Sequence, residues 1–348
     1  MTQLSLSGPI CGLTQRIIHV HAGLGCNLFC KHCYSSSGPA MKMRLDAGIV
    51  CQALSDAVKL GYEVAAFSGG EPTMHPGLVE MLKHAQSSGL RTSMTTNGTL
   101  LTGTLVSRLE GCLDLLAISL DGQPELHNRM RGSETSFSRM LEGLNQVKRS
   151  RIPYGFIFTL TEESWEQLVW AGEFAMEQGA KLLQIHPLEK IGRAESLGEI
   201  APGPEVLAKA YLLALAIQQR FGSALHVQFD VFNRDHLMQQ PQTVYASEKW
   251  NLDCAFEPAA ALNLIVLEAD GAVVPFAYGF SRQYQIANVR EQRLAQAFSV
   301  FLATEYHRLL ELCVGVFQER IVPLDFPLLN WYELIVQASR ACTEPVSA

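Results

Sequence analysis

Three cysteines lie close together near the start of the chain, in the run Cys26-Asn27-Leu28-Phe29-Cys30-Lys31-His32-Cys33-Tyr34. They follow an apolar segment, residues 17–20, whose composition predicts a buried strand. Three thiolates in one short loop can bind a single inorganic centre and leave one of its metal positions without a protein ligand. An open position of that kind is where a substrate or cofactor can bind and react.

The spacing favours an iron–sulfur cluster over the other common cysteine sites. A structural zinc site needs four ligands, usually from two separated pairs, and the sequence has no second pair. A thioredoxin-like redox pair would use only two of the three thiols. Cysteines that merely fill a core have no reason to gather in one loop. The remaining cysteines are scattered singly, at Cys11, Cys51, Cys112, Cys254, Cys313 and Cys342.

The cysteine run and three later motifs together resemble a known superfamily. Cys-x-x-x-Cys-x-x-Cys, with the aromatic His32 before the last cysteine, resembles the signature of the radical S-adenosylmethionine (radical SAM) superfamily. Phe-Ser-Gly-Gly-Glu-Pro at 67–72 and Thr-Thr-Asn-Gly at 95–98 resemble its motifs at the ends of the second and third strands. Ile-Ser-Leu-Asp-Gly at 118–122, followed by His127, Arg129 and Arg131, resembles the fourth-strand segment of the subgroup that modifies peptides and cofactor precursors.

This resemblance implies a cofactor site. Cys26, Cys30 and Cys33 would hold one 4Fe-4S cluster, and the amine and carboxylate of SAM would chelate the iron that lacks a cysteine. Glycines let the backbone approach a ligand, a glutamate accepts from an ammonium group, and an arginine pairs with a carboxylate. The cofactor-binding residues expected on these grounds are Gly69, Gly70, Glu71, Asn97, Ser119, Asp121, Arg131 and Tyr34. No catalytic side chain beyond the cluster ligands is assigned.

Alternating strand and helix patterns would position these motifs. Strands are predicted at 16–22, 63–68, 91–96, 113–120, 154–160 and 181–187. Helices are predicted at 45–60, 76–88 (with Pro76 in the first turn), 102–109, 137–149, 164–178 and 204–220. Such units require parallel strands with right-handed crossovers, and six of them predict an α/β fold with a partial (β/α)6 TIM-like barrel.

The motifs all follow predicted strands, so they should meet at one rim of the barrel. Alone, each has an ordinary explanation, since Gly-Gly, Asn-Gly and Asp-Gly mark turns and a loop arginine is usually solvated. Their shared position favours a common site instead. Thr159 and His186, near the ends of the fifth and sixth strands, are further candidates for its wall.

After about residue 222 the alternation ends, which predicts a barrel at 15–222 and a small α+β C-terminal domain at 223–348. A strand is expected at 224–232, a polar loop region at 233–247, a hairpin at 262–277 around Asp270-Gly271, and a helix at 292–312. This part resembles the SPASM or twitch extension, and Cys254 matches its first cysteine. Phe276 stands where that pattern has a cysteine, and only Cys313 and Cys342 follow, so we predict no auxiliary cluster and a role as lid or substrate scaffold.

Composition restricts the class of protein. The 348 residues are 48% hydrophobic and 18% charged, which suffices for a large core. A net charge of −7 argues against non-specific binding to nucleic acid or to an anionic membrane. We find no targeting segment, and the apolar runs are shorter than the roughly 20 residues of a spanning helix. Nine cysteines, an odd number, predict a reducing cytoplasm.

Three functions remain open. The first, favoured by the resemblance, is reductive cleavage of SAM to a 5′-deoxyadenosyl radical that takes hydrogen from a peptide or protein. The second is the same chemistry on a small, haem-like cofactor precursor, and the third is non-catalytic metal binding. The first two imply an electron donor such as flavodoxin or ferredoxin. Because only about fifteen residues precede the first strand, a peptide substrate would need a separate recognition protein or direct binding to the C-terminal domain.

Overall fold

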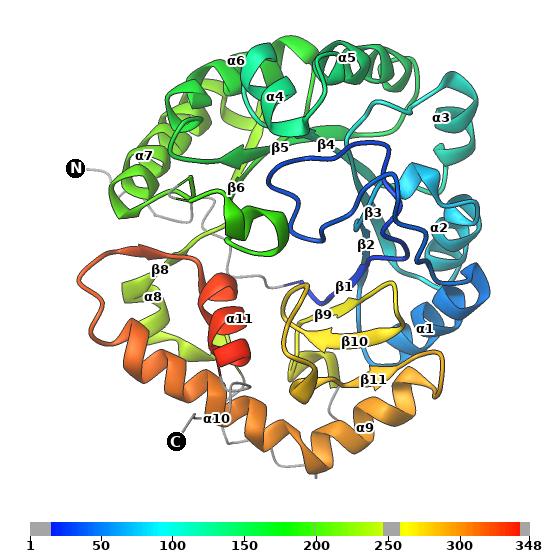
Figure 1. The fold of residues 1–348 in the computed structure, drawn as a ribbon, viewed down its shortest axis with the longest axis vertical. Coiled ribbons are helices and arrows are strands. Elements are labelled where there is room, and N and C mark those ends of the chain that lie inside the picture. Colours follow the sequence, from blue (N-terminus) through cyan, green and yellow to red (C-terminus); the bar gives the residue numbers. More distant parts are fainter. Residues whose placement is uncertain (1–14, 199, 246–257, 342–348) are drawn as a thin grey trace.

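The computed structural model describes residues 15–198, 200–245 and 258–341. Its central feature is a curved ten-stranded sheet in the order β11-β10-β9-β1-β2-β3-β4-β5-β6-β7, with helices on its outer side (Figure 1). The parallel strands predicted from sequence are β1 (Ile17–Val20), β2 (Val64–Phe67), β3 (Arg91–Thr96), β4 (Leu115–Leu120), β5 (Tyr154–Leu160) and β6 (Leu182–Pro187). All six predictions are confirmed, with ends that differ by at most two residues.

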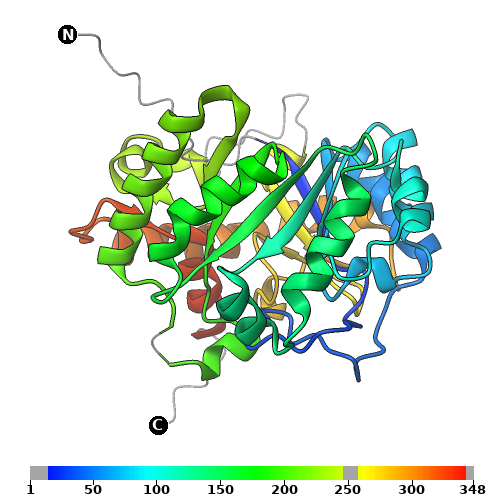
Figure 2. The same ribbon diagram turned by 90° about the horizontal axis from the view of Figure 1, so that it is seen from above.

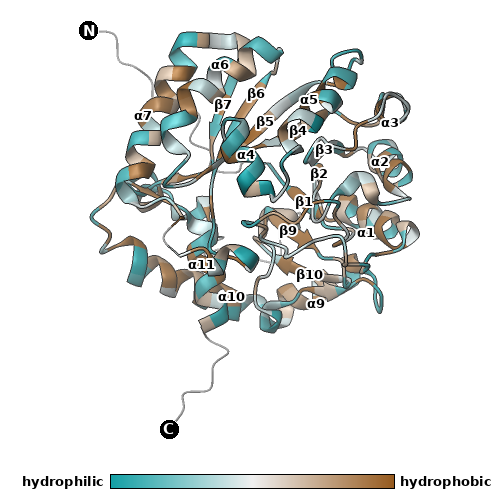
Figure 3. Ribbon diagram, turned by 45° about the horizontal axis from the view of Figure 1, so that its top comes forward, coloured by the Kyte–Doolittle hydropathy of each residue, from teal (hydrophilic) through white to brown (hydrophobic). Residues whose placement is uncertain are grey.

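The helices between these strands cover the outer face of the sheet. They are α1 (Ala47–Lys59), α2 (Leu78–Ser87), α3 (Gly103–Leu109), α4 (Pro124–Arg131), α5 (Ser136–Val147), α6 (Leu168–Gln178) and α7 (Pro204–Phe221). Figure 3 shows hydrophobic residues along the strands, while the outer helices carry both hydrophobic and hydrophilic residues. Apolar side chains from both layers form one continuous core, which includes Ile18, Leu54, Phe156 and Phe158.

One local prediction in this region is wrong, and one helix was not predicted. Pro76 does not open a helix, because Nδ1 of His75 accepts from the amide of Gly77 (3.1 Å) and holds the chain in a turn until α2 begins. The helix that was not predicted is α4, and Arg131, a predicted site residue, lies buried in its last turn with only 8% of its surface exposed. Pro124 begins that helix and Gly132, in the left-handed conformation with φ +65°, ends it.

The later part of the chain extends the same sheet at both edges. Strand β7 (His226–Phe229) pairs in parallel with β6, and β9 (Leu264–Leu267) pairs in parallel with β1. The predicted hairpin is confirmed, because β9 and β10 (Ala272–Pro275) are antiparallel around Gly271. The parallel array is therefore wider than six strands, and strands from either side of residue 222 share it.

The remaining elements pack beside the open edge of the barrel (Figure 1). They are β8 (Phe232–Asn233), α8 (Arg234–Gln239), β11 (Ala287–Asn288), α9 (Leu294–Thr304), α10 (Tyr306–Val316), β12 (Leu328–Leu329) and α11 (Trp331–Ala341). The single helix expected at 292–312 is two helices, which meet at Glu305. The region expected to be a polar loop contains the short helix α8. Among the described residues, no helix is long and apolar enough to span a membrane.

Candidate active site

The loop that follows β1 carries the three cysteines across one end of the strands (Figure 2). Its first residues pack against the Gly-Gly-Glu turn, since the amides of Gly70 and Glu71 donate to the carbonyls of Gly23 and Gly25, each at 2.9 Å. A side chain at Gly70 would place its Cβ 2.3 Å from the carbonyl oxygen of Gly25. Close approach of two backbone segments therefore requires this glycine.

The three thiols are free and lie together in this loop. Cys26 and Cys30 are buried and pack with Leu28, and Cys33 is half-buried beside them. Burial raises the pKa of Cys26 to about 12 and raises that of Cys30 too, so these thiols stay protonated until a metal centre stabilises their thiolates. In residues 15–198, 200–245 and 258–341, no three His, Cys, Asp or Glu side chains converge around a single ion. The donor set, three thiols in one loop, fits a cluster better than one zinc ion.

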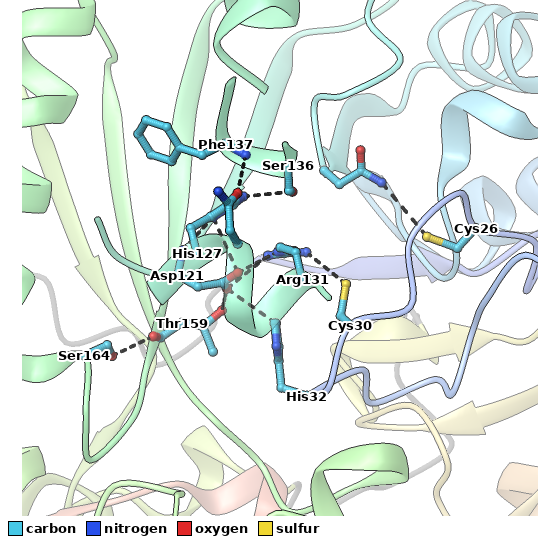
Figure 4. A network of polar contacts seen from close by, with 12 residues as sticks. Cys26, Cys30, His32, Asp121, His127, Arg131, Ser136, Phe137, Thr159 and Ser164 are labelled. Carbon is cyan, nitrogen blue, oxygen red and sulfur yellow. Dashed lines mark hydrogen bonds and ion pairs between the residues drawn. The ribbon is translucent and has the colours of Figure 1, made fainter. Parts of the chain in front are cut away.

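A buried ion pair connects Cys30 to the fourth strand (Figure 4). Arg131 Nε and Nη2 donate to the two carboxylate oxygens of Asp121 at 2.6 and 3.0 Å, and Nη1 lies 3.8 Å from the sulfur of Cys30. Thr159 Oγ1 also donates to Asp121, at 2.8 Å. Burial opposes charge on Asp121, but Arg131 holds the pKa of this carboxyl well below its usual range. The bidentate partner of Arg131 is thus the carboxylate of Asp121, and Nη1 faces the sulfur of Cys30.

Two histidines flank this ion pair in their neutral form. Burial lowers the pKa of His32 and of His127 to about 4, although both lie within 3.5 Å of Asp121. His127 Nδ1 accepts from the Asp121 amide at 3.3 Å, and its Nε2 lies 3.2 Å from the Ser136 hydroxyl, so it braces α4 and α5. His32 Nδ1 is buried without a hydrogen-bond partner in the described part of the chain.

A second group of polar contacts surrounds Cys26. Glu71 accepts hydrogen bonds from the side chains of Thr73 and Thr96 and from the backbone of Thr73 and Asn97, at 2.6 to 3.1 Å. Asn97 Nδ2 donates to Asn27 at 3.0 Å and lies 4.0 Å from the sulfur of Cys26. The carboxylate of Glu71 is therefore engaged with its own chain, where it fixes the end of β3 against the cysteine loop.

A third group connects the last cysteine to the second strand. Tyr34 Oη lies 3.0 Å from the Ser68 hydroxyl and accepts from the amide of Gly69 at 3.3 Å. Gly69 has φ +107°, and its carbonyl accepts from Ser35 at 3.2 Å. Ser119 is half-buried on β4, and its hydroxyl makes no hydrogen bond within the described residues, so it is available to a ligand. The structure thus brings the predicted cluster and cofactor-binding residues to the cysteine-loop end of β1 to β4, and it places the further candidates Thr159 and His186 on β5 and β6.

Comparison with known proteins supports this arrangement. A family model for the radical SAM superfamily matches residues 20–175. The chain belongs to the radical SAM superfamily. An AdoMet-dependent heme synthase of Methanosarcina barkeri is 31% identical over 54% of this chain and 54% of its own length. A PqqA peptide cyclase of Ruegeria pomeroyi is 32% identical over 72% of this chain and 64% of its own length.

The chain spans only about half of the haem synthase and under two thirds of the peptide cyclase. Two solved radical SAM structures share its fold at low identity. SuiB of Streptococcus suis bound to S-adenosylmethionine has a TM-score of 0.64 and 16% identity, covering 82% of this chain and 65% of SuiB. The structure of anSMEcpe with bound AdoMet has a TM-score of 0.63 and 18% identity, covering 93% of this chain and 95% of anSMEcpe.

The inner wall of this radical SAM barrel differs between its two halves. Along the strands, fully buried residues face the helices and alternate with less buried ones that face the lumen. Towards the cysteine-loop ends of β2 to β4 the lumen-facing residues are small: Ala66, Ser68 (just after β2), Ser93, Thr95, Ala117 and Ser119. Larger residues, Val64, Arg91 and Leu115, lie on the same face at the other ends of these strands. On β1, β6 and β7, and just beyond them, they are larger and polar: His19, His21, Gln184, His186, Gln228 and Asp230. The first half leaves room for a ligand, and the second offers it hydrogen bonds.

His186, a candidate from the sequence, lies in the polar half of the radical SAM barrel. Its Nδ1 is 2.9 Å from Asp230, which also accepts from Gln184 and Gln228 at 2.6 and 2.7 Å. Although burial opposes the charge, the bond to Asp230 raises the pKa of His186 to about 9. Across the lumen, burial and the charge of His186 lower the pKa of His19 to about 4. Sequence reasoning found His186 but missed Asp230, its partner just after β7.

Arg193 is another residue that the motifs did not reveal. It lies in the short 3₁₀ helix Gly192–Ser196 that follows β6, and its backbone and guanidinium contact the cysteine loop. A Gly-Arg pair after a strand gives no signal of this contact, because the partners are about 160 residues away in the chain.

The C-terminal cysteines lie outside the site as far as they are described. Cys313 is buried in the apolar core, where burial raises its pKa. Cys254 and Cys342 lie outside the described residues. Phe276 is buried beside Phe280 and Tyr332, with ring centroids 5.8 and 6.5 Å apart. The position where a SPASM pattern has a cysteine is thus part of an aromatic cluster.

Proposed function

We propose that this protein holds one 4Fe-4S cluster with Cys26, Cys30 and Cys33 and binds S-adenosylmethionine in the lumen beside them. When bound, the reduced cluster would supply the electron that splits SAM into methionine and a 5′-deoxyadenosyl radical, which takes hydrogen from a substrate. The observation that carries this proposal is that one loop with three free thiols lies at the same barrel end as the Gly69–Glu71 turn and the Asp121–Arg131 pair.

The chain's own residues have separate tasks in this proposal. The Gly70 turn fits the cysteine loop by close backbone contact, and Glu71 and Asn97 hold that loop against β3. Arg131 presents a fixed positive charge to the sulfur of Cys30, which stabilises a thiolate there. The small side chains of β2 to β4 leave space for the nucleoside of SAM, with Ser119 as a free hydroxyl for it.

The polar half of the lumen favours a peptide or protein as the substrate. A haem-like precursor carries several carboxylates, which call for arginine or lysine. The lumen-facing positions of β6 and β7, and His19 and His21 of β1, include neither, and the positive charge of His186 is paired with Asp230. Asp230 lies among them, and the charges of Glu189 and Glu333 act on His186 from nearby. Amide and hydroxyl groups of a peptide suit such a wall better than carboxylates.

The haem-type alternative remains a second candidate, because an AdoMet-dependent heme synthase is among the similar proteins. The C-terminal part would serve as a SPASM-like scaffold without an auxiliary cluster, since Phe276 and Cys313 are core residues. The reaction would need an electron donor such as flavodoxin or ferredoxin, and a peptide substrate could require a separate recognition protein.

The test is release of 5′-deoxyadenosine from SAM by anaerobically reconstituted, dithionite-reduced protein. We expect release above the rate of a matched sample in which Cys33 is replaced by alanine. No release from the reconstituted wild-type protein would contradict the proposed activity. A zinc-loaded protein without sulfide would favour the non-catalytic alternative.

A further inference from the structure

The segment after β6 is docked directly on the cysteine loop. The backbone amide of Arg193 donates to the carbonyl of Cys33 at 3.0 Å, and its Nε donates to the carbonyl of Cys30 at 2.8 Å. Its Nη2 donates to the carbonyl of Ser37 at 2.7 Å. One residue therefore binds three carbonyls of the loop, two of them from proposed cluster ligands.

Two further contacts fix the position of this arginine. Its guanidinium carbon lies 3.9 Å from the ring centroid of Phe29, a residue between the first two cysteines whose side chain is otherwise 60% exposed. Gly192, with φ +64°, lies so close to the loop that a Cβ would be 2.3 Å from the carbonyl of Tyr34. The segment and the loop are thus fitted to each other through backbone contacts.

The same segment is held from its other side by the C-terminal helix α11. Glu333 of α11 accepts from the amide of Lys190 at 3.2 Å, and Asn330 just before α11 donates to Glu189 at 2.9 Å. Arg340, near the end of α11, pairs with Glu195 at 3.1 Å. Contacts therefore run without interruption from α11 through residues 189–195 to the cysteines.

We infer that Arg193 is a positioning residue for the cluster, and that α11 supports it there. The inference rests on the proposed function. Three carbonyl contacts restrict the backbone of a short loop that must present three thiolates to one centre. A fixed cation beside the ligands also favours the more negative, reduced state of a cluster. The C-terminal region thereby contributes to the metal site without supplying a metal ligand.

The test compares cluster stability and potential in Arg193→Gln, Arg193→Lys and Phe29→Leu with wild type, all reconstituted with iron and sulfide. Arg220→Gln is the matched control, because Arg220 pairs with Glu173 on the outer helices, far from the loop. The readouts are the rate of iron loss to a chelator and the midpoint potential followed by electron paramagnetic resonance.

We expect Arg193→Gln to lose iron at least about ten times faster than the control, the range seen when groups that orient metal ligands are removed. Its midpoint potential should fall. Arg193→Lys keeps the charge but not the three-carbonyl geometry, so it should restore the potential and only part of the stability. Phe29→Leu, at an exposed position that tolerates change, should lose iron moderately faster even if Arg193→Gln does not fold.

Wild-type rates and potentials in all three variants would overturn the role of Arg193 while leaving the proposed function intact. A wild-type protein that binds no iron and sulfide at all would instead contradict the proposed function itself. The two failures are therefore distinguishable in one set of samples.

Discussion

The regions on the two sides of strand β1 differ in the surroundings of a position that resembles a metal-binding motif. On one side, the cysteine loop packs on the end of β2 and is surrounded by polar contacts from Asn97, Arg131 and Arg193. On the other side, beyond the β9–β10 hairpin, Phe276 is buried among aromatic rings. Buried polar groups need partners, whereas an apolar cluster needs only packing. Polar contacts therefore surround the cysteine loop, where charge is stabilised, whereas apolar packing surrounds Phe276, which follows β10.

The difference between the two regions is tested most strongly by removing a proposed cluster ligand. Replacing Cys30 with alanine should abolish both iron binding and 5′-deoxyadenosine release, because three thiolates are needed for the cluster. Iron analysis and product detection check this. Cys51→Ala is the control, since Cys51 lies on α1 away from the loop, and it should retain both properties. Equal loss in the two variants would contradict the assignment.

Breaking the buried ion pair behind the loop should have a large effect on stability. Asp121→Asn leaves Arg131 without its counter-charge, and breaking one partner of a buried pair costs about 3–5 kcal/mol. Urea unfolding measures this loss. Glu173→Gln, which breaks the exposed pair with Arg220, should cost less than about 1 kcal/mol. Similar losses of unfolding free energy in the two variants would contradict a stabilising role for the buried Asp121–Arg131 pair.

The same ion pair predicts that the unfolding free energy falls in acid. The pKa of Asp121 is lower in the folded protein than in the unfolded chain, so its contribution is complete above the unfolded value of about 4. That contribution is lost as the pH falls below about 4. Wild-type unfolding free energy should therefore decline more steeply than that of Asp121→Asn in this range. Parallel curves would contradict an ionised Asp121.

The hairpin side can be tested by truncating its aromatic residue. Phe276→Ala should destabilise the protein by about 3–5 kcal/mol, the cost of emptying a buried aromatic site, without changing the iron content per chain. Unfolding curves and iron analysis of the same sample check both parts. A fall in bound iron under conditions where the variant is folded would show that this side also supports a metal.

The smallest effect should come from His186, in the polar half of the lumen. Its folded pKa of about 9 exceeds the unfolded value, so its stabilisation is complete below about pH 6.5 and is lost as the pH rises towards 9. Because its side chain is 43% exposed, solvent screening limits the effect to about 1 kcal/mol or less. His186→Gln should flatten the stability profile between these pH values, whereas His226→Gln, at an exposed position, should not.

Local patterns predicted the strands and the cysteine loop, because apolar strands, helix ends and short motifs are encoded by neighbouring residues. Helix α4 was missed, since Leu126 and Met130 are its only apolar residues, although Pro124 and Gly132 marked its ends. The partners of the site residues were not predictable. Arg131 pairs with Asp121 only because the unpredicted helix α4 turns it back towards the end of β4. His186 pairs with Asp230, and Arg193 with the carbonyls of the loop, only when segments far apart in the chain meet.

We propose that one cluster, held by the loop after β1, is the metal centre of the protein. Iron and acid-labile sulfide per chain, measured after anaerobic reconstitution, decide whether this is so. We expect about four irons and four sulfides per chain, and their loss when Cys26, Cys30 and Cys33 are replaced together. About eight irons per chain, or about four that survive this triple replacement, would contradict it.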